Sequence, residues 1–175
     1  LSINRGFSAP VEVTAPVSAD DLVFLAAHDD DPFARYEAMQ QLIVRHLVAA
    51  VAGNLPDAER AAGRAAIGNA MGAILDDAAL DDLMRGELLI LPGEAYLAEQ
   101  LDRADPTRIF AEREGLKRWL GEALQDKWLA LHDRCSVVPY SLEAAARGAR
   151  KLKTQALVYL AAANPAEAAR RAKAQ

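Results

Sequence analysis

The chain has 175 residues, 52% of them hydrophobic and 26% charged, and its 25 acidic and 20 basic residues give a formal net charge of −5. This balance is typical of a folded soluble domain and excludes a disordered tail. Aromatic residues make up only 6%, which favours helices over sheet, and a pI near 5.2 argues against nucleic acid or an anionic membrane as a general partner.

The first 17 residues differ in pattern from the rest. Apolar and polar residues alternate from Phe7 to Val13, which predicts one strand with a single buried face. Pro10 cannot donate a ladder hydrogen bond, so we expect this strand at a sheet edge. The remaining sequence offers it no partner strand, and we expect the rest of its sheet to lie outside this chain.

From Ser18 onward the pattern is helical. Ser18 with Asp21 predicts the N-terminal cap of a short helix. Asp31, Asp105 and Asn164 each precede a proline, and a capping side chain followed by proline favours a helix start. The predicted helices span residues 18–28, 32–52, 57–76, 79–88, 93–102, 106–134, 141–163 and 165 to the end.

These helices follow one another with short joints. In the segment 106–134, Leu116, Leu120, Leu124 and Trp128 recur every four residues, as one buried stripe of a helix does. Trp119 lies nine residues before Trp128, so the two rings are expected to anchor separate packing contacts. The sequence therefore predicts an all-α fold, an antiparallel helical superhelix or solenoid of the HEAT or ARM type, with a short N-terminal β-strand remnant.

The sequence carries no targeting or disulfide signal. Cys135 is the only cysteine, which excludes an intrachain disulfide and fits a reducing, cytoplasmic compartment. The start of the chain lacks the order of a secretory leader, and no apolar run approaches the ~20 residues that span a bilayer. We therefore expect a cytoplasmic protein with no membrane partner.

Three groups of residues are candidates for metal or catalytic sites. His28 stands beside three consecutive aspartates, but no glycine supplies the sharp turn of an EF-hand, so a solvated helix corner is the better interpretation. His46 is not part of HExxH and is interpreted as a structural, half-buried histidine. His132 and Cys135 are neighbours in sequence only, which does not make a nucleophile and its base, and Cys135 is expected to be a small buried side chain.

Two charged segments are also interpreted as structural. The acidic residues Asp76, Asp77, Asp81 and Asp82 surround a predicted helix start, where the helix dipole favours carboxylates. The basic residues Arg147, Arg150, Lys151 and Lys153 either meet a phosphate or acidic partner or form the solvent face of the 141–163 helix, and the solvent face is preferred. The sequence thus predicts no catalytic, no cofactor-binding and no metal-binding residue.

Longer segments resemble a known family. RGFSAPV at Arg5–Val11 and the stretch Ser18–Leu42 are similar to bacterial aminopeptidase N proteins of the M1 zinc metallopeptidase family, and so are Leu89–Leu120 and Ala146–Ala161. Tyr36 stands where that family often has tryptophan. The positions that fit its helical pattern are Asp21, Phe24, Leu25, His28, Asp31, Phe33, Arg35, Ala38, Gln40 and Leu42.

The resemblance implies a place in a larger enzyme. Residues 1–17 would end a β-sandwich domain, and residues 18–175 would form the first part of a C-terminal helical domain. The parent would be a zinc aminopeptidase of the membrane alanyl aminopeptidase type that removes N-terminal amino acids from peptides, with one zinc ion. The family's HExxH, its downstream glutamate, its GAMEN-like segment and its catalytic tyrosine do not occur here, so this portion alone should be inactive.

In such a parent the helical portion would cover the active site and restrict peptide access. Its partners would be the zinc domain and the remaining helices, with peptide substrates reached through the parent. The alternative is a free-standing helical-repeat module that binds a protein partner in a groove.

Overall fold

The computed structural model describes residues 2, 3, 5–7 and 16–174, and within these ranges every regular element is a helix. A single 3-10 turn, η1 (Arg5–Phe7), precedes the α-helices. Their bounds are α1 (Ala19–His28), α2 (Pro32–Ala52), α3 (Asp57–Asp76), α4 (Asp82–Leu88), α5 (Glu94–Glu99), α6 (Pro106–Ala123), α7 (Gln125–Ser136), α8 (Ala144–Ala163) and α9 (Pro165–Lys173). None of these helices is both long and apolar enough to cross a membrane.

Four of the α-helices begin at the caps that the sequence predicts. The Ser18 hydroxyl accepts from the Asp21 amide at 3.1 Å, and the Asp21 carboxylate accepts in return from the Ser18 amide at 3.3 Å, which completes a capping box. Asp31 caps α2, Asp105 caps α6 and Asn164 caps α9, each with proline at the first helical position. The expected strand from Phe7 to Val13 lies, apart from Phe7, outside the described residues.

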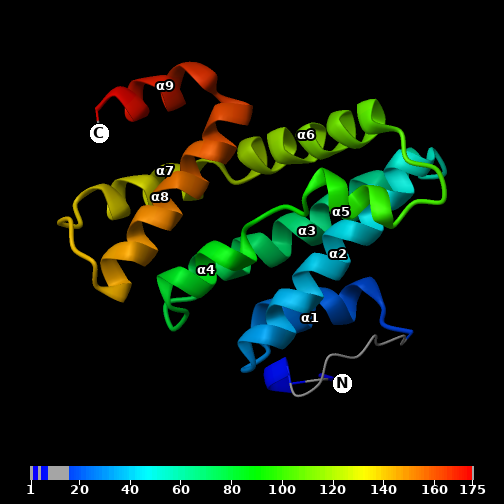
Figure 1. The fold of residues 1–175 in the computed structure, drawn as a ribbon, viewed down its shortest axis with the longest axis horizontal. Coiled ribbons are helices and arrows are strands. Elements are labelled where there is room, and N and C mark those ends of the chain that lie inside the picture. The colour runs from blue at the N-terminus through cyan, green and yellow to red at the C-terminus, as the bar shows by residue number, and fades with distance from the viewer. Residues whose placement is uncertain (1, 4, 8–15, 175) are drawn as a thin grey trace.

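The helices stack in order along the array (Figure 1). At one end α2 packs against α1, α3 and α6, which form the first layer. At the other end α8 packs against α4, α6, α7 and α9, which form the second layer. The chain therefore passes from one packed layer to the next through short joints, as the sequence predicts for a helical solenoid. The boundary expected between residues 17 and 18 stays a prediction.

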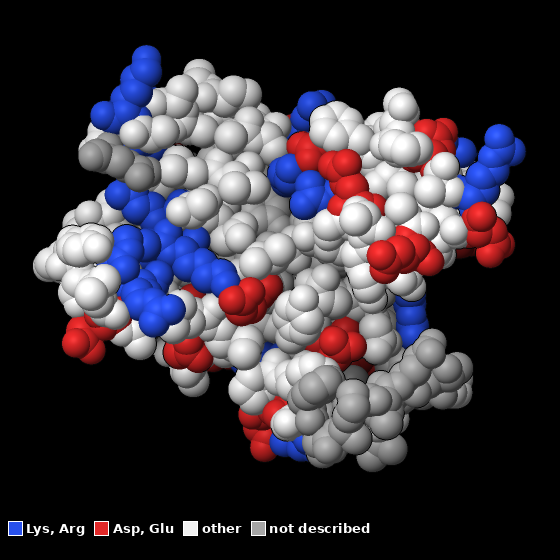
Figure 2. All heavy atoms as spheres, viewed as in Figure 1, with Lys and Arg blue, Asp and Glu red and all other residues white. Residues whose placement is uncertain are grey.

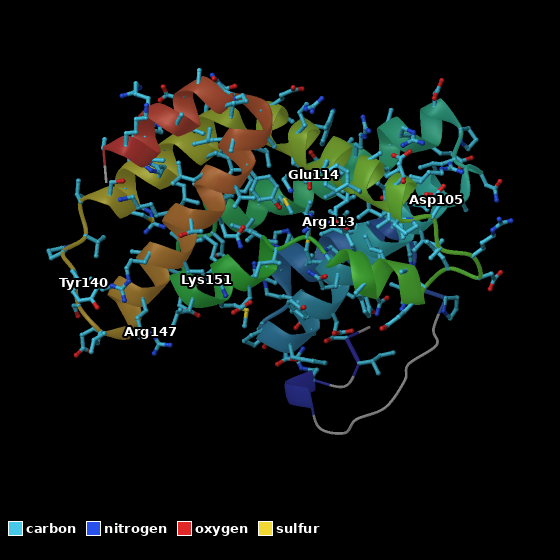
Figure 3. All side chains as sticks on the ribbon, turned by 45° about the horizontal axis from the view of Figure 1, so that its top comes forward. Asp105, Arg113, Glu114, Tyr140, Arg147 and Lys151 are labelled. Carbon is cyan, nitrogen blue, oxygen red and sulfur yellow. The ribbon has the colours of Figure 1, made fainter. Side chains whose placement is uncertain are left out.

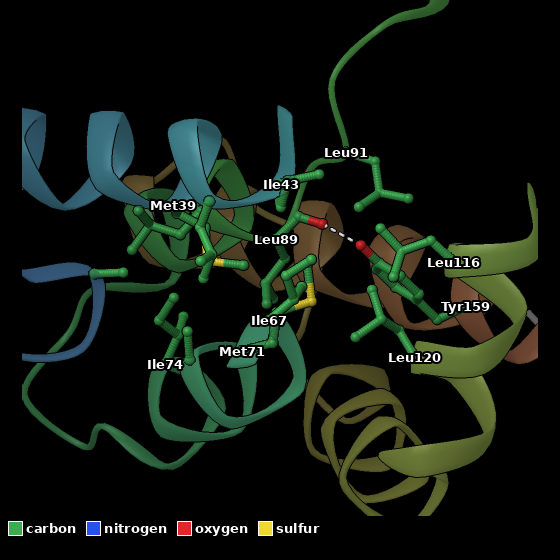
Figure 4. Packing of buried hydrophobic residues seen from close by; sticks show 14 of the residues in the cluster. Met39, Ile43, Ile67, Met71, Ile74, Leu89, Leu91, Leu116, Leu120 and Tyr159 are labelled. Carbon is green, nitrogen blue, oxygen red and sulfur yellow. Dashed lines mark hydrogen bonds between the residues drawn. The ribbon is translucent and has the colours of Figure 1, made fainter. Parts of the chain in front are cut away.

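An aromatic pair forms the centre of the second layer. The rings of Trp128 and Tyr159 are stacked, with centroids 4.3 Å apart and planes 7° from parallel, and both side chains are fully buried. The Tyr159 hydroxyl donates to the Leu89 carbonyl oxygen at 2.6 Å, which ties α8 to the segment after α4 (Figure 4). Gly121 lets α6 approach α8, because a Cβ there would collide with the Tyr159 carbonyl and lie 2.9 Å from the Ala163 Cβ.

The prediction of a single helix over residues 106–134 is wrong. The chain bends at Leu124 (φ −114°, ψ 23°), which separates α6 from α7. In a straight helix Trp128 would lie about 12 Å along the axis from Leu120. In the bent chain the Trp128 indole N–H instead donates to the Leu120 carbonyl at 3.1 Å. The bend thus lets α6 and α7 both pack on α8, a tertiary effect that the regular spacing of the leucines conceals.

The helix predicted over residues 141–163 also starts later than expected. The Ser141 hydroxyl accepts from the Glu143 amide at 3.0 Å, which makes a turn, and α8 begins at Ala144. The turn leaves residues 137–143 as a connection between α7 and α8.

Candidate functional site

The aspartates after His28 brace a corner between helices. The Asp31 carboxylate caps α2 by accepting from the Ala34 amide at 3.1 Å, and it accepts from the Gly6 amide at 2.9 Å. Asp29 is paired with Arg5 at 3.0 Å, and Arg5 also bonds Asp30, which lowers the pKa of the Asp30 carboxyl. Asp29 and Asp30 therefore share the Arg5 guanidinium, while Asp31 accepts from backbone amides, and all three carboxylates serve to hold the corner.

Arg35 is a buried residue whose bonding role the residue pattern around it does not reveal. Its guanidinium donates to the carbonyls of Ala26 at 3.0 Å and Ala27 at 3.1 Å, and to the Asp77 carboxylate at 3.0 Å. It thus joins the end of α1 to the end of α3 from within α2. The only signal for it was its place in the family pattern.

Arg85 has the same role in the next layer. It donates to the Ile74 carbonyl at 3.2 Å, the Leu80 carbonyl at 3.0 Å and the Asp82 carboxylate at 2.6 Å. Both arginines satisfy main-chain carbonyls where helices end, which is where backbone acceptors are otherwise orphaned. Nothing in the sequence marks Arg85 as different from a surface arginine.

The four aspartates Asp76, Asp77, Asp81 and Asp82 are stabilised in two different ways, and the sequence predicts only one of them. Asp81 caps α4, and Asp82 lies in its first turn, so the helix dipole favours both. Asp76 and Asp77 instead end α3, where the dipole disfavours a carboxylate, so the dipole interpretation is wrong for them. Arg35 holds Asp77, and its hydrogen bond lowers the pKa of that carboxyl, while Lys127 pairs with Asp76 at 2.5 Å.

His46 is a structural residue, as predicted, although it is buried more deeply than half. It packs against Gly63, where a Cβ would collide with the imidazole Nδ1 and lie 3.2 Å from Cε1. Burial, with the positive charges of Arg64 and Arg60 nearby, lowers the pKa of His46 to about 4. The imidazole is therefore neutral at pH 7 and packs as a member of the core between α2 and α3.

His132 and Cys135 do not form a nucleophilic pair. The His132 Nδ1 lies 3.0 Å from the Arg171 guanidinium, which also bonds Asp133 and so links α7 to α9. Cys135 is buried, and burial raises the pKa of its thiol. The expectation that Cys135 is a small buried side chain is therefore confirmed.

The basic segment lies along the exposed side of α8. Blue atoms gather there beside the α7–α8 connection in Figure 2, and Figure 3 shows Tyr140, Arg147 and Lys151 at the same end of the molecule. Lys151 pairs with Glu87, whereas Arg147 is exposed without a partner in the described part of the chain. Arg150 lies over the Tyr140 ring, 4.8 Å from its centroid.

The hollows among the described residues include one of about 680 Å³, between the end of α2 and residues 100–108. Another, of about 490 Å³, lies between Gly6, the start of α2 and α4. In the larger hollow, the Asp105 carboxylate already caps α6 through the Thr107 amide at 3.0 Å, and Arg108 donates to the Ala50 carbonyl at 3.3 Å. Two of its charged groups are thus used by the scaffold.

No three His, Cys, Asp or Glu side chains converge within the described ranges in a way that would hold a metal ion. The chemistry of these residues is that of a scaffold: caps, buried arginines and stacked rings. The residues that carry the resemblance have this character too. Asp21 and Asp31 are caps, Arg35 is a buried brace, and Gln40 donates to the Ile90 carbonyl at 3.0 Å.

Comparisons with known proteins identify relatives of this chain. The chain is 34% identical over 95% of its length to aminopeptidase N of Caulobacter vibrioides, and 31% identical over 89% to aminopeptidase N of Escherichia coli. It spans 19% and 18% of the length of those two relatives. The resemblance to aminopeptidase N noted from the sequence is thereby confirmed.

A solved structure shows the same fold. The crystal structure of Legionella pneumophila aminopeptidase A in complex with aspartic acid superposes with a TM-score of 0.82 at 24% identity, over 99% of this chain and 21% of that one. A family model described as "Domain of unknown function (DUF3458_C) ARM repeats" matches residues 19–175. The all-helical, ARM-like fold class is therefore confirmed, and the chain belongs to the DUF3458_C family of ARM-repeat domains.

Proposed function

We propose that this chain is the non-catalytic helical portion of a zinc-dependent aminopeptidase that removes N-terminal amino acids from peptides. The observation that carries the proposal is the 34% identity to aminopeptidase N over 95% of this chain, within only 19% of that relative. A cytoplasmic location belongs to the proposal and is supported by the single unpaired cysteine.

The zinc ion and the catalytic groups belong to another region of the proposed parent. The donor set here does not fit a zinc site, because no three His, Cys, Asp or Glu side chains of the described residues come together in a way that would hold a metal ion. We therefore assign no step of the reaction to a residue of this chain.

The proposed role is steric. A helical array with a continuous apolar core and buried arginine braces is a stiff wall. Placed over a metal site, such a wall would admit short or unfolded peptides, exclude folded chains and limit the access of bulk water. In this proposal the function of the chain depends on its rigidity more than on any single side chain.

The test starts with the reading frame that encodes Leu1–Gln175 in its source. The polypeptide encoded by that frame and the 175-residue chain are assayed on aminoacyl p-nitroanilides, with zinc content measured for both. We expect hydrolysis and about one zinc per molecule for the longer polypeptide, and neither for the short chain. A frame without a metallopeptidase segment would refute the proposal and leave the free-standing interaction module.

A second arm tests the steric role. A free tetrapeptide is compared with the same four residues at the N-terminus of a folded protein. The longer polypeptide should cleave the free peptide and spare the folded protein. Equal rates on both substrates would refute access control while leaving the aminopeptidase assignment intact.

A further inference from the structure

The connection between α7 and α8 gathers exposed apolar side chains. Of the nine large hydrophobic side chains exposed in the described part of the chain, four lie within six residues: Val137 (81% exposed), Val138 (41%), Tyr140 (80%) and Leu142 (76%). Single exposed apolar residues are ordinary, but a contiguous group is typical of an interaction site. We call these four residues, with Arg147, Arg150 and Lys153, the α8 patch.

The connection is held in place by its neighbours. The Arg150 guanidinium donates to the Ser141 carbonyl at 2.7 Å and lies over the Tyr140 ring. The Ser141 hydroxyl accepts from the Glu143 amide at 3.0 Å. The apolar side chains are thus presented to solvent by a fixed backbone, so a partner would lose little conformational entropy in ordering them.

The charge of the α8 patch is opposite to that of the whole chain. Residues 137–153 contain four basic residues and one acidic residue, whereas the chain carries a net charge of −5. Glu87 takes up Lys151, but Arg147, Arg150 and Lys153 have no carboxylate partner among the described residues. Uncompensated cations beside apolar side chains are complementary to an acidic surface that also offers apolar contacts.

Two other occupants fit less well. A second copy docked through the same patch would bring two sets of uncompensated cations together, and these repel. An anionic bilayer would extend beyond the patch and meet Glu87 and the rest of a chain whose net charge is −5. A protein surface of limited area meets neither obstacle.

We infer that the α8 patch docks an acidic, apolar-bearing segment from another region of the larger polypeptide, an inference that rests on the proposed function. Tyr140 and Leu142 would supply the buried contact, and Arg147 and Lys153 would select the acidic partner. The α7–α8 connection is then an internal joint between this helical portion and the rest of the enzyme.

Hydroxyl-radical footprinting read by mass spectrometry tests this. Oxidation of Tyr140 and Leu142 is measured in the 175-residue chain and in the longer polypeptide from the same reading frame. We expect fast oxidation in the short chain and loss of most of it in the longer one. The Arg147→Glu substitution and high salt should both restore oxidation, because both weaken an acidic contact. Arg118→Glu is the matched control, since Arg118 is exposed and unpartnered among the described residues of α6.

Four outcomes would overturn the inference. Equal oxidation in both polypeptides means that nothing covers the patch. Protection that Arg147→Glu and salt leave unchanged excludes an acidic occupant. Protection of the short chain that grows with its concentration assigns the patch to a second copy, and protection only with phosphatidylserine vesicles assigns it to a membrane. A longer polypeptide that covers the patch but binds no zinc and hydrolyses nothing refutes the proposed function alone.

Discussion

Replacing Tyr159 by phenylalanine removes one hydroxyl from the centre of the second layer. The side chain is 1% exposed, and its hydroxyl donates to the Leu89 carbonyl at 2.6 Å. Phenylalanine keeps the ring that stacks on Trp128, so the apolar packing stays and only the hydrogen bond is lost. The Leu89 carbonyl then loses this buried donor.

The magnitude follows from that burial. Removing one partner of a buried hydrogen bond costs about 1–3 kcal/mol, because the remaining group pays its desolvation without compensation. For a chain of this size each kcal/mol lowers the melting temperature by about 2–4 °C. We therefore expect Tyr159→Phe to lose about 1–3 kcal/mol of unfolding free energy and to melt about 2–12 °C below the parent chain.

The assay is urea unfolding followed by circular dichroism and by tryptophan fluorescence, whose coincidence checks two-state behaviour. Tyr96→Phe is the control, because Tyr96 is 50% exposed and its change should stay within about 0.5 kcal/mol. A Tyr159→Phe chain as stable as the Tyr96→Phe chain would refute the reasoning, since it would mean that the carbonyl of Leu89 does not need the hydroxyl.

Three further changes have defined outcomes. Gly121→Ala should lower the free energy of unfolding, measured in urea, by about 2 kcal/mol. Overpacking costs about 1–3 kcal/mol, and the higher helix propensity of alanine offsets at most about 1 kcal/mol of this. A more stable variant would contradict the close approach of α6 to α8. Arg35→Met should lower the free energy of unfolding by about 3 kcal/mol or more, because it removes the donor for the Ala26 and Ala27 carbonyls and the partner of Asp77. Arg118→Met should change it by almost nothing, and equal losses for the two variants would show that the burial of Arg35 does not matter. The pKa of His46 is lowered from 6.5 to about 4 in the folded chain, so as the pH falls the unfolded chain binds the proton first. The free energy of unfolding should therefore decrease by about 1.4 kcal/mol per pH unit as the pH is lowered from 6.5 to 4. His46→Gln should reduce that slope, a fraction of it remaining because burial also lowers the pKa of His132, and an unchanged slope would contradict the assignment.

Helix starts were predictable because their signals are local. Asp31, Asp105 and Asn164 cap helices through the next three residues, so the chemistry of each start is contained in a few letters of sequence. The bend at Leu124 was not predictable in this way. It depends on Trp128 and on the surface of α8, and the Tyr159 ring on which Trp128 stacks comes more than thirty residues later.

The difference between local and tertiary signals also decides which features of the site could be predicted from the sequence. The absence of HExxH is read directly from the letters. His46 is interpreted as structural because Leu47 and Val48 follow it and no second ligand stands four residues on, and Cys135 because proximity to His132 in sequence alone does not make a nucleophile. Arg35 and Arg85 could not be recognised, because an arginine in a helix looks alike whether it faces solvent or a neighbouring helix end. The α8 patch was seen only as a basic segment, since the exposure of Tyr140 and Leu142 depends on where α8 begins.

The partners of Arg35 also set an order for biosynthesis. Two of its acceptors, the carbonyls of Ala26 and Ala27, precede it by nine and eight residues, but the Asp77 carboxylate follows it by 42. At about 5–20 residues per second, a ribosome needs roughly 2–8 s to add that stretch. During this interval the nascent α1–α2 pair holds a guanidinium whose counter-ion has not been made. Completion of the first layer must therefore wait for the end of α3.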